Sequence, residues 1–355
     1  MNFYYLSIDL IRCCWLDGKQ IGTVPMALHV ALPKHVQDRQ ALTFVLGTSD
    51  GRAPCDLNCP GCLPFVRKED VRKAWCDAAY RFVVRDCVTD GGANLVAVQA
   101  FEPLLSAIMP TTFSIMHEAY QLRTEGHDVE TSIVTNGSHI ADYLGILSWM
   151  AGNGTDIHVT FAGATKASHD QWRRQRDQEN ERSSFDDLMH GLAEAHATRV
   201  PGTHRVVSDH VTAVLVLLPR RNLTETVVGL PTLLRSVGVS RLVVQPFIAI
   251  GTNPGKHIIR GRFANALAAL EHECAMQGVM LEVDDLYRAL QDHEVDLSAF
   301  VVQANKKPFV RWLPDGRCTT ADNFLSVVDE TLPRWLPEKD GPTPGELFRE
   351  LLGSS

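Results

Sequence analysis

The stretch that decides the fold reads Ala41-Leu-Thr-Phe-Val-Leu-Gly47 and continues, seven residues later, as Pro54-Cys-Asp-Leu-Asn-Cys-Pro-Gly-Cys62. Its first part is a short, mostly apolar run that ends at a glycine, which predicts a buried strand. Its second part places Cys55, Cys59 and Cys62 on a loop directly after that strand. Three thiolates on a tight loop can hold three irons of a cubane cluster and leave the fourth iron open.

Five further apolar runs follow, and each is separated from the next by a longer stretch with helical periodicity. The predicted strands are Leu95–Phe101, Thr131–Asn136, Asp156–Phe161, Val211–Leu218 and Arg241–Phe247. The predicted helices are Lys68–Val84, Thr112–Glu125, Ser138–Gly152, Asp170–His196, Thr224–Val237 and Phe263–Gln277. Nearly continuous apolar strands with helical crossovers indicate an α/β fold with a parallel sheet, either open or curved into a full or partial barrel. In each case, chemistry gathers at the carboxyl ends of the strands.

Composition and charge exclude several other classes of protein. The 355 residues are 45% apolar and 21% charged, as in an ordinary folded chain. The net charge is −8, from 34 Lys and Arg against 42 Asp and Glu, so no nucleic-acid partner is expected. Met1–Trp15 lacks the features of a signal peptide, and the longest apolar run, Val211–Leu218, is too short to span a membrane. We therefore expect a cytoplasmic protein without a membrane partner.

Nine cysteines are an odd number and a low density for a chain of this length, which favours a reducing compartment. For the loop cysteines, a zinc site and inert buried thiols are alternatives to an iron–sulfur cluster. Structural zinc needs four ligands, and the nearest other cysteines have no paired spacing. Five cysteines outside the loop are expected to be buried free thiols: Cys13, Cys14, Cys76, Cys87 and Cys274.

The CxxxCxxC spacing after the first strand resembles the signature of the radical S-adenosylmethionine (radical SAM) enzymes. The resemblance covers roughly Leu42 to Gln277. It implies a partial (β/α)6 TIM-like barrel in which Cys55, Cys59 and Cys62 hold a [4Fe-4S] cluster. It further implies that S-adenosyl-L-methionine binds the fourth iron and is cleaved by one electron, from a donor such as flavodoxin or ferredoxin. The product would be a 5′-deoxyadenosyl radical that abstracts hydrogen from the substrate.

The later strand ends resemble this family in part. Glu102-Pro103-Leu104 matches the end of its Gly-Gly-Glu-Pro-Leu motif, although Ala100 and Phe101 replace the glycines, so the local geometry is expected to differ. The resemblance implies that Glu102 accepts a hydrogen bond from the methionine ammonium; the alternative is an ordinary carboxylate at a helix N-terminus. It implies further cofactor-binding roles, at successive strand ends, for Thr135, Asn136, Thr160 and Arg173. Ala162 departs from the pattern, because a carboxylate is usual there.

The chain is expected to consist of three units. They are a cap at residues 1–40, a core barrel at 41–277 and a C-terminal α/β extension at 278–355. The cap has apolar runs around Leu6 and at Ala27–Leu32. In the extension we expect a short helix at Leu286–Leu297, a strand at Phe309–Leu313, a turn at Pro314-Asp315-Gly316 and a loosely held tail at Pro333–Pro344.

Cys318 is the only cysteine after Gln277, so the sequence predicts one cluster per chain. Cys318 is a weak candidate for a hydrogen donor to a substrate radical; an unreactive thiol is the alternative. No other catalytic residue is assigned. His204, His210 and His257 are expected near the carboxyl ends of the fifth and sixth strands and could face a substrate there, although a surface or core role is the more common one for a histidine.

The short cap and the single cysteine of the extension favour a small polar metabolite as substrate, such as a sugar, nucleoside or amino-acid derivative. The expected reaction is a redox-neutral biosynthetic step: decarboxylation, deoxygenation, epimerisation or rearrangement. Modification of a peptide or protein is the alternative within the enzyme class. A metal-binding scaffold without catalytic activity is the alternative outside it.

Overall fold

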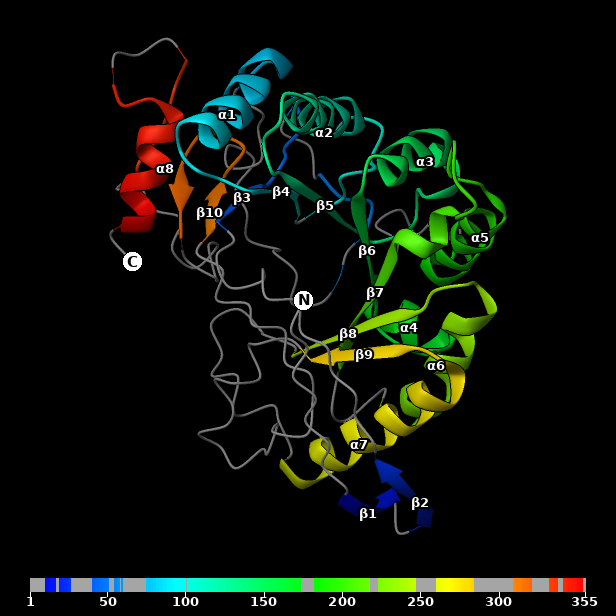
Figure 1. Ribbon diagram of the computed structural model, residues 1–355. Helices are drawn as coiled ribbons and strands as arrows, with labels where there is room; N and C mark the ends of the chain where they lie inside the picture. The colour runs from blue at the N-terminus through cyan, green and yellow to red at the C-terminus, as the bar shows by residue number, and fades with distance from the viewer. Residues whose placement is uncertain are drawn as a thin grey trace.

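The computed structural model describes most of the chain, and one sheet forms its centre (Figure 1). The described residues are 10–16, 19–26, 40–50, 54–57, 59, 75–99, 101–173, 182–217, 223–246, 260–283, 309–320, 332–337 and 341–353. Nine strands make up this sheet, in the order β11-β10-β3-β4-β5-β6-β7-β8-β9. Every neighbouring pair is parallel except β10 and β11, which form an antiparallel hairpin.

All six strands predicted for the core are present, in chain order across the sheet. They are β3 (Ala41–Phe44), β4 (Leu95–Val98), β5 (Glu130–Thr135), β6 (Thr155–Phe161), β7 (Val211–Leu217) and β8 (Arg241–Pro246). The sheet also contains β9 (Met280–Val283), β10 (Phe309–Trp312) and β11 (Cys318–Thr319). Of these three, only β10 corresponds to a predicted strand. Because β10 pairs with β3, the extension continues the sheet of the core.

Helices cover the convex side of the curved sheet (Figure 1). They are α1 (Asp77–Thr89), α2 (Met109–Thr124), α3 (Leu144–Gly152), α4 (Lys166–Trp172), α5 (Ser184–Ala197), α6 (Leu223–Ser236) and α7 (Arg260–Gln277). A 3-10 turn, η1 (Ala141–Tyr143), leads into α3. Within the described chain, no helix is long and apolar enough to cross a bilayer.

Strands β5 and β6 alternate between a buried and a half-buried face, whereas β3 is buried at every position. Along β6, Ile157, Val159 and Phe161 are buried, whereas the residues between them are partly exposed. The buried side chains join one continuous apolar core with those of the helices, as expected for a sheet packed beneath a helical layer. The opposite, concave face is therefore the side on which polar residues of the strands remain accessible.

The predicted helix Asp170–His196 is wrong, because two helices, α4 and α5, occupy that region. Ser183 caps the start of α5 by accepting a hydrogen bond from the Asp186 amide at 3.1 Å. Asp170 accepts from the Ser183 hydroxyl at 2.6 Å and from the Phe185 amide at 2.9 Å. Serine and aspartate satisfy the free amides of a helix start, so these residues begin a new helix. The predicted helix at Lys68–Val84 is observed from Asp77 onward.

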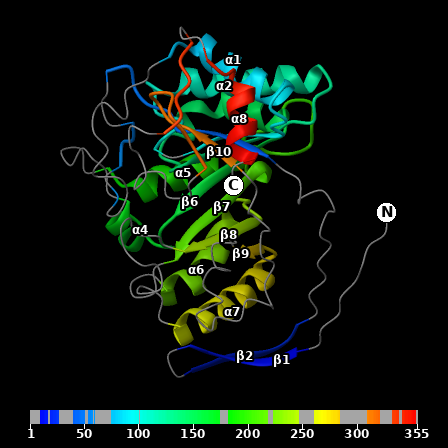
Figure 2. The ribbon, with the colours of Figure 1, turned by 90° about the vertical axis from the view of Figure 1, so that its left-hand side faces the viewer.

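At the N-terminal end, an antiparallel hairpin of β1 (Leu10–Leu16) and β2 (Lys19–Met26) lies beside α7, and both views show this placement (Figures 1 and 2). The hairpin was not predicted. The apolar runs around Leu6 and at Ala27–Leu32, and the helix expected at Leu286–Leu297, lie outside the described residues.

The tail is held to the body of the protein, contrary to expectation. The Trp335 amide donates to the Gly316 carbonyl at 3.1 Å, and the Trp335 ring packs edge-on against Trp75 with centroids 5.2 Å apart. Helix α8 (Pro344–Gly353) then packs against α1, where the Gly345 amide donates to Asp86 Oδ2 at 2.7 Å. An amphipathic last helix and an anchoring tryptophan account for this order. The expected turn is present, with Gly316 at a φ of 90°.

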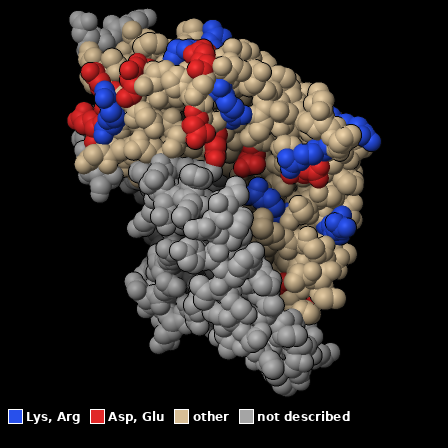
Figure 3. All heavy atoms as spheres, in the orientation of Figure 1, with Lys and Arg blue, Asp and Glu red and all other residues tan. Residues whose placement is uncertain are grey.

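On the face shown in Figure 3, Lys and Arg side chains are interspersed with Asp and Glu over the described surface. Arg85 of α1 forms ion pairs with Glu118 and Glu125, each at 2.7 Å. Mixed charges of this kind form no single-sign field for steering a charged partner.

Candidate functional site

Glu102 is the most enclosed charged residue at the carboxyl ends of the strands. It has no exposed surface and lies four residues after Val98, the last residue of β4. One carboxylate oxygen, Oε1, accepts from the Thr135 hydroxyl at 2.6 Å and from the Leu104 amide at 2.9 Å. The other, Oε2, accepts from the Asn136 amide at 2.7 Å. A carboxylate has about four acceptor sites, so one site on Oε2 is available to a further donor.

The backbone at Phe101 turns sharply to present Glu102. Phe101 has a φ of 56°, the left-handed region that glycine adopts without steric cost. The conformation costs a non-glycine residue about 1–2 kcal/mol. The Phe101 ring packs against Val45 and Leu313, which offsets this cost. Phe101 thus has a backbone conformation that suits the glycine of the family motif; Ala100 lies outside the described residues.

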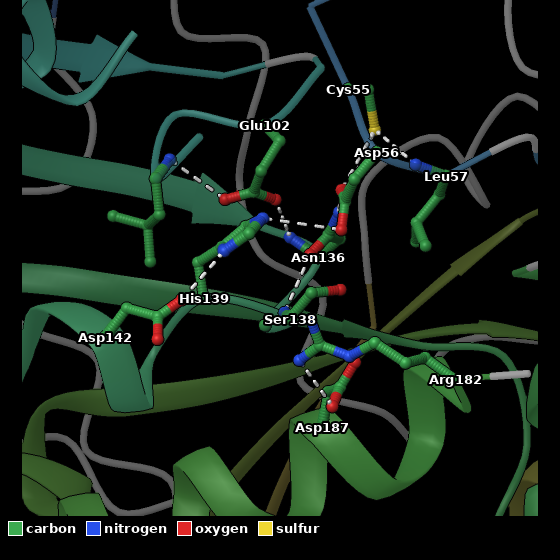
Figure 4. A network of polar contacts seen from close by, with 12 residues as sticks. Cys55, Asp56, Leu57, Glu102, Asn136, Ser138, His139, Asp142, Arg182 and Asp187 are labelled. Atoms are coloured by element: carbon green, nitrogen blue, oxygen red, sulfur yellow. Dashed lines mark hydrogen bonds and ion pairs between the residues drawn. The ribbon is translucent and has the colours of Figure 1, made fainter. Parts of the chain in front are cut away.

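Thr135, Asn136 and Gly137 form the turn after β5, next to Glu102. Gly137 has a φ of 87°, and a Cβ atom there would lie 2.4 Å from Leu188 Cδ1, so only glycine fits. The turn is closed by two bonds: the Gly137 amide donates to Thr135 Oγ1 at 3.0 Å, and the Ser138 amide donates to Asn136 Oδ1 at 2.8 Å. The Asn136 side-chain amide consequently points away from β5, towards the cysteine loop (Figure 4).

Cys55 and Cys59 lie at the carboxyl end of β3 and are both half-buried. The Cys55 sulfur is 3.4 Å from the Leu57 amide nitrogen and 3.8 Å from Asn136 Nδ2. The loop is also joined to the segment before Glu102, because the Glu102 amide donates to the Pro54 carbonyl at 3.0 Å. The structure therefore brings together Cys55, Glu102, Thr135 and Asn136; Cys62 lies outside the described residues.

Burial raises the pKa of the Cys55 thiol to about 12, and the negative charges of Asp56 and Glu102 act in the same direction. Without a cation nearby, this sulfur is a neutral thiol. A thiolate there needs positive charge, which iron supplies when it binds. Among the described residues, which exclude Cys62, no group of three or more His, Cys, Asp or Glu side chains is arranged to hold a metal ion. The two described cysteines nevertheless offer the soft thiol ligands that an iron–sulfur cluster requires, and Cys59 is near enough to Cys55 to affect its pKa.

Asp56 and His139 belong to this site but were not singled out in the sequence. Asp56 Oδ1 accepts from Asn136 Nδ2 at 2.7 Å, and Asp56 Oδ2 lies 3.4 Å from His139 Nε2 (Figure 4). Asp142 Oδ2 contacts the opposite ring nitrogen, Nδ1, at 3.0 Å. In the sequence, only their positions next to motif residues could have indicated a role. Asp56 lies between two loop cysteines, and His139 closely follows the Thr135-Asn136-Gly137 turn.

The charges of this pair are complementary. Contact with the Asp56 carboxylate, helped by Asp142, raises the pKa of His139 to about 9. Burial acts to raise the pKa of Asp56, but the contacts with His139 and Asn136 outweigh it and hold that pKa below its usual value. For Glu102, burial dominates over its three hydrogen bonds and raises the pKa to about 7.

Thr160 and Arg173 lie at the next strand end. Thr135 is in register with Val159, so Thr160 lies level with Asn136, on the partly exposed face of β6. Arg173 ends α4, and its Nε atom is buried with no hydrogen-bond partner among the described residues. The Ser138 hydroxyl after β5 is likewise buried without a partner. Unpartnered buried donors at a strand edge suit a polar ligand such as an amino-acid carboxylate.

His169 supports the strand end from within the core. Its ring lies between Phe161 and Phe185, with centroids 6.1 and 5.6 Å away, and its Nδ1 accepts from the Ala162 amide at 3.4 Å. Burial, together with the Arg173 charge, lowers the pKa of His169 to about 3, so the ring is neutral.

Cys318 lies away from the site. It is fully buried and faces the helical side of the sheet, in register with Trp312, and its electrostatic neighbours include Cys87 of α1. This placement favours the alternative of an unreactive thiol. Cys87 and Cys274 are buried as expected, whereas Cys76 is exposed, which corrects the expectation for that residue. The side chains of Cys13 and Cys14 lie outside the described set.

Two of the candidate histidines lie at the wrong end of the strands. His204 and His210 precede β7 in a parallel sheet, so they lie at its amino end, opposite the cysteine loop. His204 is exposed. The error arose because the residues were placed by distance along the chain rather than by strand direction. His257 lies outside the described residues.

Comparison with known proteins identifies the fold. No family model and no curated protein matches the sequence. SuiB from Streptococcus suis, in a structure bound to S-adenosylmethionine, superimposes with a TM-score of 0.59 over 89% of this chain at 13% identity. The chain spans 65% of SuiB, just under two thirds of its length. The structure of anSMEcpe with bound AdoMet gives a TM-score of 0.60 over 88% of this chain and 80% of anSMEcpe, also at 13% identity.

These neighbours are radical SAM enzymes, whose fold is a partial TIM barrel. The predicted fold class is therefore confirmed. The identities show a shared fold and leave the activity of this chain to be argued from its own residues.

Proposed function

Because this chain has the fold of the radical SAM enzymes, we propose that it is one of them: it binds a [4Fe-4S] cluster and S-adenosyl-L-methionine, and abstracts hydrogen from a substrate. The observation that carries the proposal is the position of Cys55 beside Asn136 and Glu102 at three adjacent strand ends. A thiol with a purely structural role does not need polar neighbours. A thiol that binds a cluster beside an amino-acid ligand needs them, because they orient the ligand and the cluster.

Cys55, Cys59 and Cys62 would hold the cluster, which supplies the electron that cleaves the bound sulfonium when S-adenosyl-L-methionine is present. The residues around it bind and orient the methionine part. Glu102 offers its free acceptor site on Oε2 to the ammonium group, and Thr135 and the Asn136 amide hold that carboxylate in place. Arg173, with its unpartnered Nε, is the proposed partner of the methionine carboxylate.

The alternative of a scaffold without catalysis is tested by cofactor cleavage. Reconstituted protein should form 5′-deoxyadenosine under strong reduction even without substrate, because every proposed ligand of the cluster and of S-adenosyl-L-methionine belongs to this chain. A protein that binds iron and S-adenosyl-L-methionine but forms no 5′-deoxyadenosine would be a scaffold.

For the substrate, the features of the sequence support a small polar metabolite in a redox-neutral step. Only one cysteine follows residue 277, and Cys318 lies buried on the far side of the sheet, so no second cluster is proposed to remove an electron. A flavodoxin- or ferredoxin-like protein is the proposed electron donor, and a reducing, cytoplasmic setting suits both the donor and the cysteines.

A peptide or protein is the second candidate, and the structural neighbours favour it. SuiB has been solved with its precursor peptide SuiA, and anSMEcpe with AdoMet and the Cp18Cys peptide. The N-terminal hairpin and the strands β10 and β11 show that both ends of the chain add structure around the core.

One labelling experiment separates the two substrate classes. Anaerobic, reduced protein is incubated with S-adenosyl-L-methionine and one deuterium-labelled candidate at a time. The candidates are sugars, nucleosides and amino acids suggested by neighbouring genes, and ribosomal peptides encoded by them. Deuterium in 5′-deoxyadenosine from a small metabolite supports the first class. Transfer only from a peptide or protein rejects it in favour of the second.

A further inference from the structure

The Asp56 carboxylate links the cysteine loop to the turn after β5. It lies between Cys55 and Leu57, and its side chain is 19% exposed. Each oxygen contacts a different residue: Oδ1 accepts from Asn136 Nδ2 at 2.7 Å, and Oδ2 lies 3.4 Å from His139 Nε2. A carboxylate held at both oxygens has a fixed orientation, and so does the short backbone segment that carries it.

His139 is itself held from behind. Its Nδ1 atom lies 3.0 Å from Asp142 Oδ2, and Asp142 belongs to η1, the 3-10 turn that leads into α3. The imidazole therefore lies between two carboxylates, one on the cysteine loop and one on the barrel (Figure 4). Nδ1 is hydrogen-bonded to Asp142, and Nε2 is in ion-pair contact with Asp56 without a hydrogen bond. A carboxylate on each side of the ring restricts its rotation, as is common for groups that orient metal ligands.

The linkage ends at the Cys55 sulfur. Asn136 Nδ2, which donates to Asp56, also lies 3.8 Å from Cys55 Sγ, and the Leu57 amide lies 3.4 Å from the same atom. Asp56 therefore holds the Asn136 N–H group near this sulfur, and the Leu57 N–H group lies next to Asp56 in the loop itself. Asp56 Oδ1 also lies 3.8 Å from Cys55 Sγ. N–H groups directed at cluster sulfurs stabilise the more negative, reduced form and raise the reduction potential.

We propose that His139 and Asp56 are positioning residues that act through one another to hold the Cys55 sulfur and its N–H neighbours in place for the cluster. The role towards the cluster rests on the proposed function. The contacts among Asp56, Asn136 and His139 are present in the protein without a cluster. Neither residue touches the reacting atoms.

The first test uses cluster-free protein, so its result does not depend on the proposed function. Hydrogen exchange is followed at the Leu57 amide in wild type, His139→Ala and Asp56→Asn. Asp56→Asn keeps an acceptor for Asn136 and loses only the charge that faces His139. Both variants should exchange about tenfold faster, because a partly buried contact between charged groups holds the loop. His190→Ala, at an exposed histidine of α5, is the matched control and should exchange as wild type.

The double variant and a conservative replacement sharpen this test. If His139 acts through Asp56, the double variant His139→Ala with Asp56→Asn should exchange no faster than the faster single variant. His139→Gln retains an N–H donor towards Asp56 and should restore part of the protection. Wild-type exchange in both single variants, or additive effects in the double variant, would overturn the proposal.

The second test uses anaerobically reconstituted protein and a redox titration followed by electron paramagnetic resonance. The cluster of His139→Ala should have a more negative midpoint potential than that of wild type and His190→Ala. Asp56→Asn is not used in this comparison, because it also removes a negative charge whose oxygen lies 3.8 Å from the Cys55 sulfur. Faster loop exchange with an unchanged potential would overturn the role assigned to the Cys55 sulfur. If wild type takes up no cluster at all, the proposed function fails, and the exchange experiment still decides whether the linkage exists.

Discussion

Glu102 Oε2 lies 2.7 Å from the backbone nitrogen of Asn136, so the carboxylate that follows β4 is fixed to the turn that follows β5. The two residues are 34 positions apart in sequence and come together because their strands are parallel neighbours. Asn136 in turn contacts the cysteine loop through its side chain. Three strand ends thereby share one polar network, and the predictions below change it one part at a time.

Glu102→Gln should weaken binding of S-adenosyl-L-methionine by roughly tenfold to a hundredfold, because a neutral amide replaces the charged partner of the ammonium. The change keeps the size of the side chain and its acceptor for Asn136. Binding is measured by equilibrium dialysis on reconstituted protein, with iron content as a check that the cluster is intact. Glu118→Gln, on α2 beside Arg85, is the control. An unchanged dissociation constant would remove Glu102 from the cofactor site.

The affinity for S-adenosyl-L-methionine should also depend on pH through Glu102. Its pKa is raised to about 7 in the free protein, so the carboxyl is largely protonated below that pH. An ammonium ligand favours the ionised form, and binding below pH 7 must therefore release a proton. The affinity should rise by up to about tenfold per pH unit from about pH 5.5 and level off above about pH 7.5.

The matched experiment is the same titration on Glu102→Gln, which has no group to ionise at that position. Its affinity should change less with pH than that of wild type. Parallel pH profiles for the two proteins would assign the dependence to another group.

Replacing Cys55, Cys59 and Cys62 together by alanine should abolish cluster binding, whereas the parent should hold about four irons and four sulfides per chain. Iron and sulfide analysis with the visible absorption spectrum measures this. Cys76→Ala is a suitable control because Cys76 is exposed and lies outside the loop. A brown chromophore in the triple variant would contradict the assignment, and about eight irons in the parent would reveal a second cluster.

Phe101→Gly should be more stable than Phe101→Ala by about 1 kcal/mol, the reverse of the order at most positions. Both variants lose the ring that packs on Val45 and Leu313. Only glycine also removes the cost of the left-handed backbone at φ 56°. Urea denaturation of the two variants gives the difference in free energy of unfolding. A less stable glycine variant would show that the backbone at this position is not strained.

The core strands and most helices could be predicted because their apolar periodicity is local. Leu42, Val96 and Ile133, all fully buried, come from runs that read plainly as strands. Glu102, Thr135 and Asn136 were found from motifs, and the structure brings them together. The break between α4 and α5 was missed, because a cap by Ser183 and a bond to Asp170 depend on the folded chain.

Other features could not be predicted from the sequence, because they depend on the direction of the strands or on contacts between residues far apart in the chain. His204 and His210 were placed at the wrong sheet edge, because chain proximity carries no information on which end of a strand a residue approaches. Asp56 and His139 are 83 positions apart and have no common motif, and their contact exists only once β3 and β5 are aligned with β4 between them. Cys318 was a weak candidate for a hydrogen donor, and its burial and its register with Trp312 place it in the core.

The central claim, reductive cleavage of S-adenosyl-L-methionine by this chain, is tested most directly by measuring 5′-deoxyadenosine. Reconstituted protein is reduced with dithionite under anaerobic conditions, S-adenosyl-L-methionine is added, and the products are separated by chromatography and identified by mass. The account predicts 5′-deoxyadenosine and methionine in equal amounts from wild type and none from the triple cysteine variant. Cluster-loaded, reduced wild type that forms no more 5′-deoxyadenosine than the triple variant, while binding S-adenosyl-L-methionine, would contradict it.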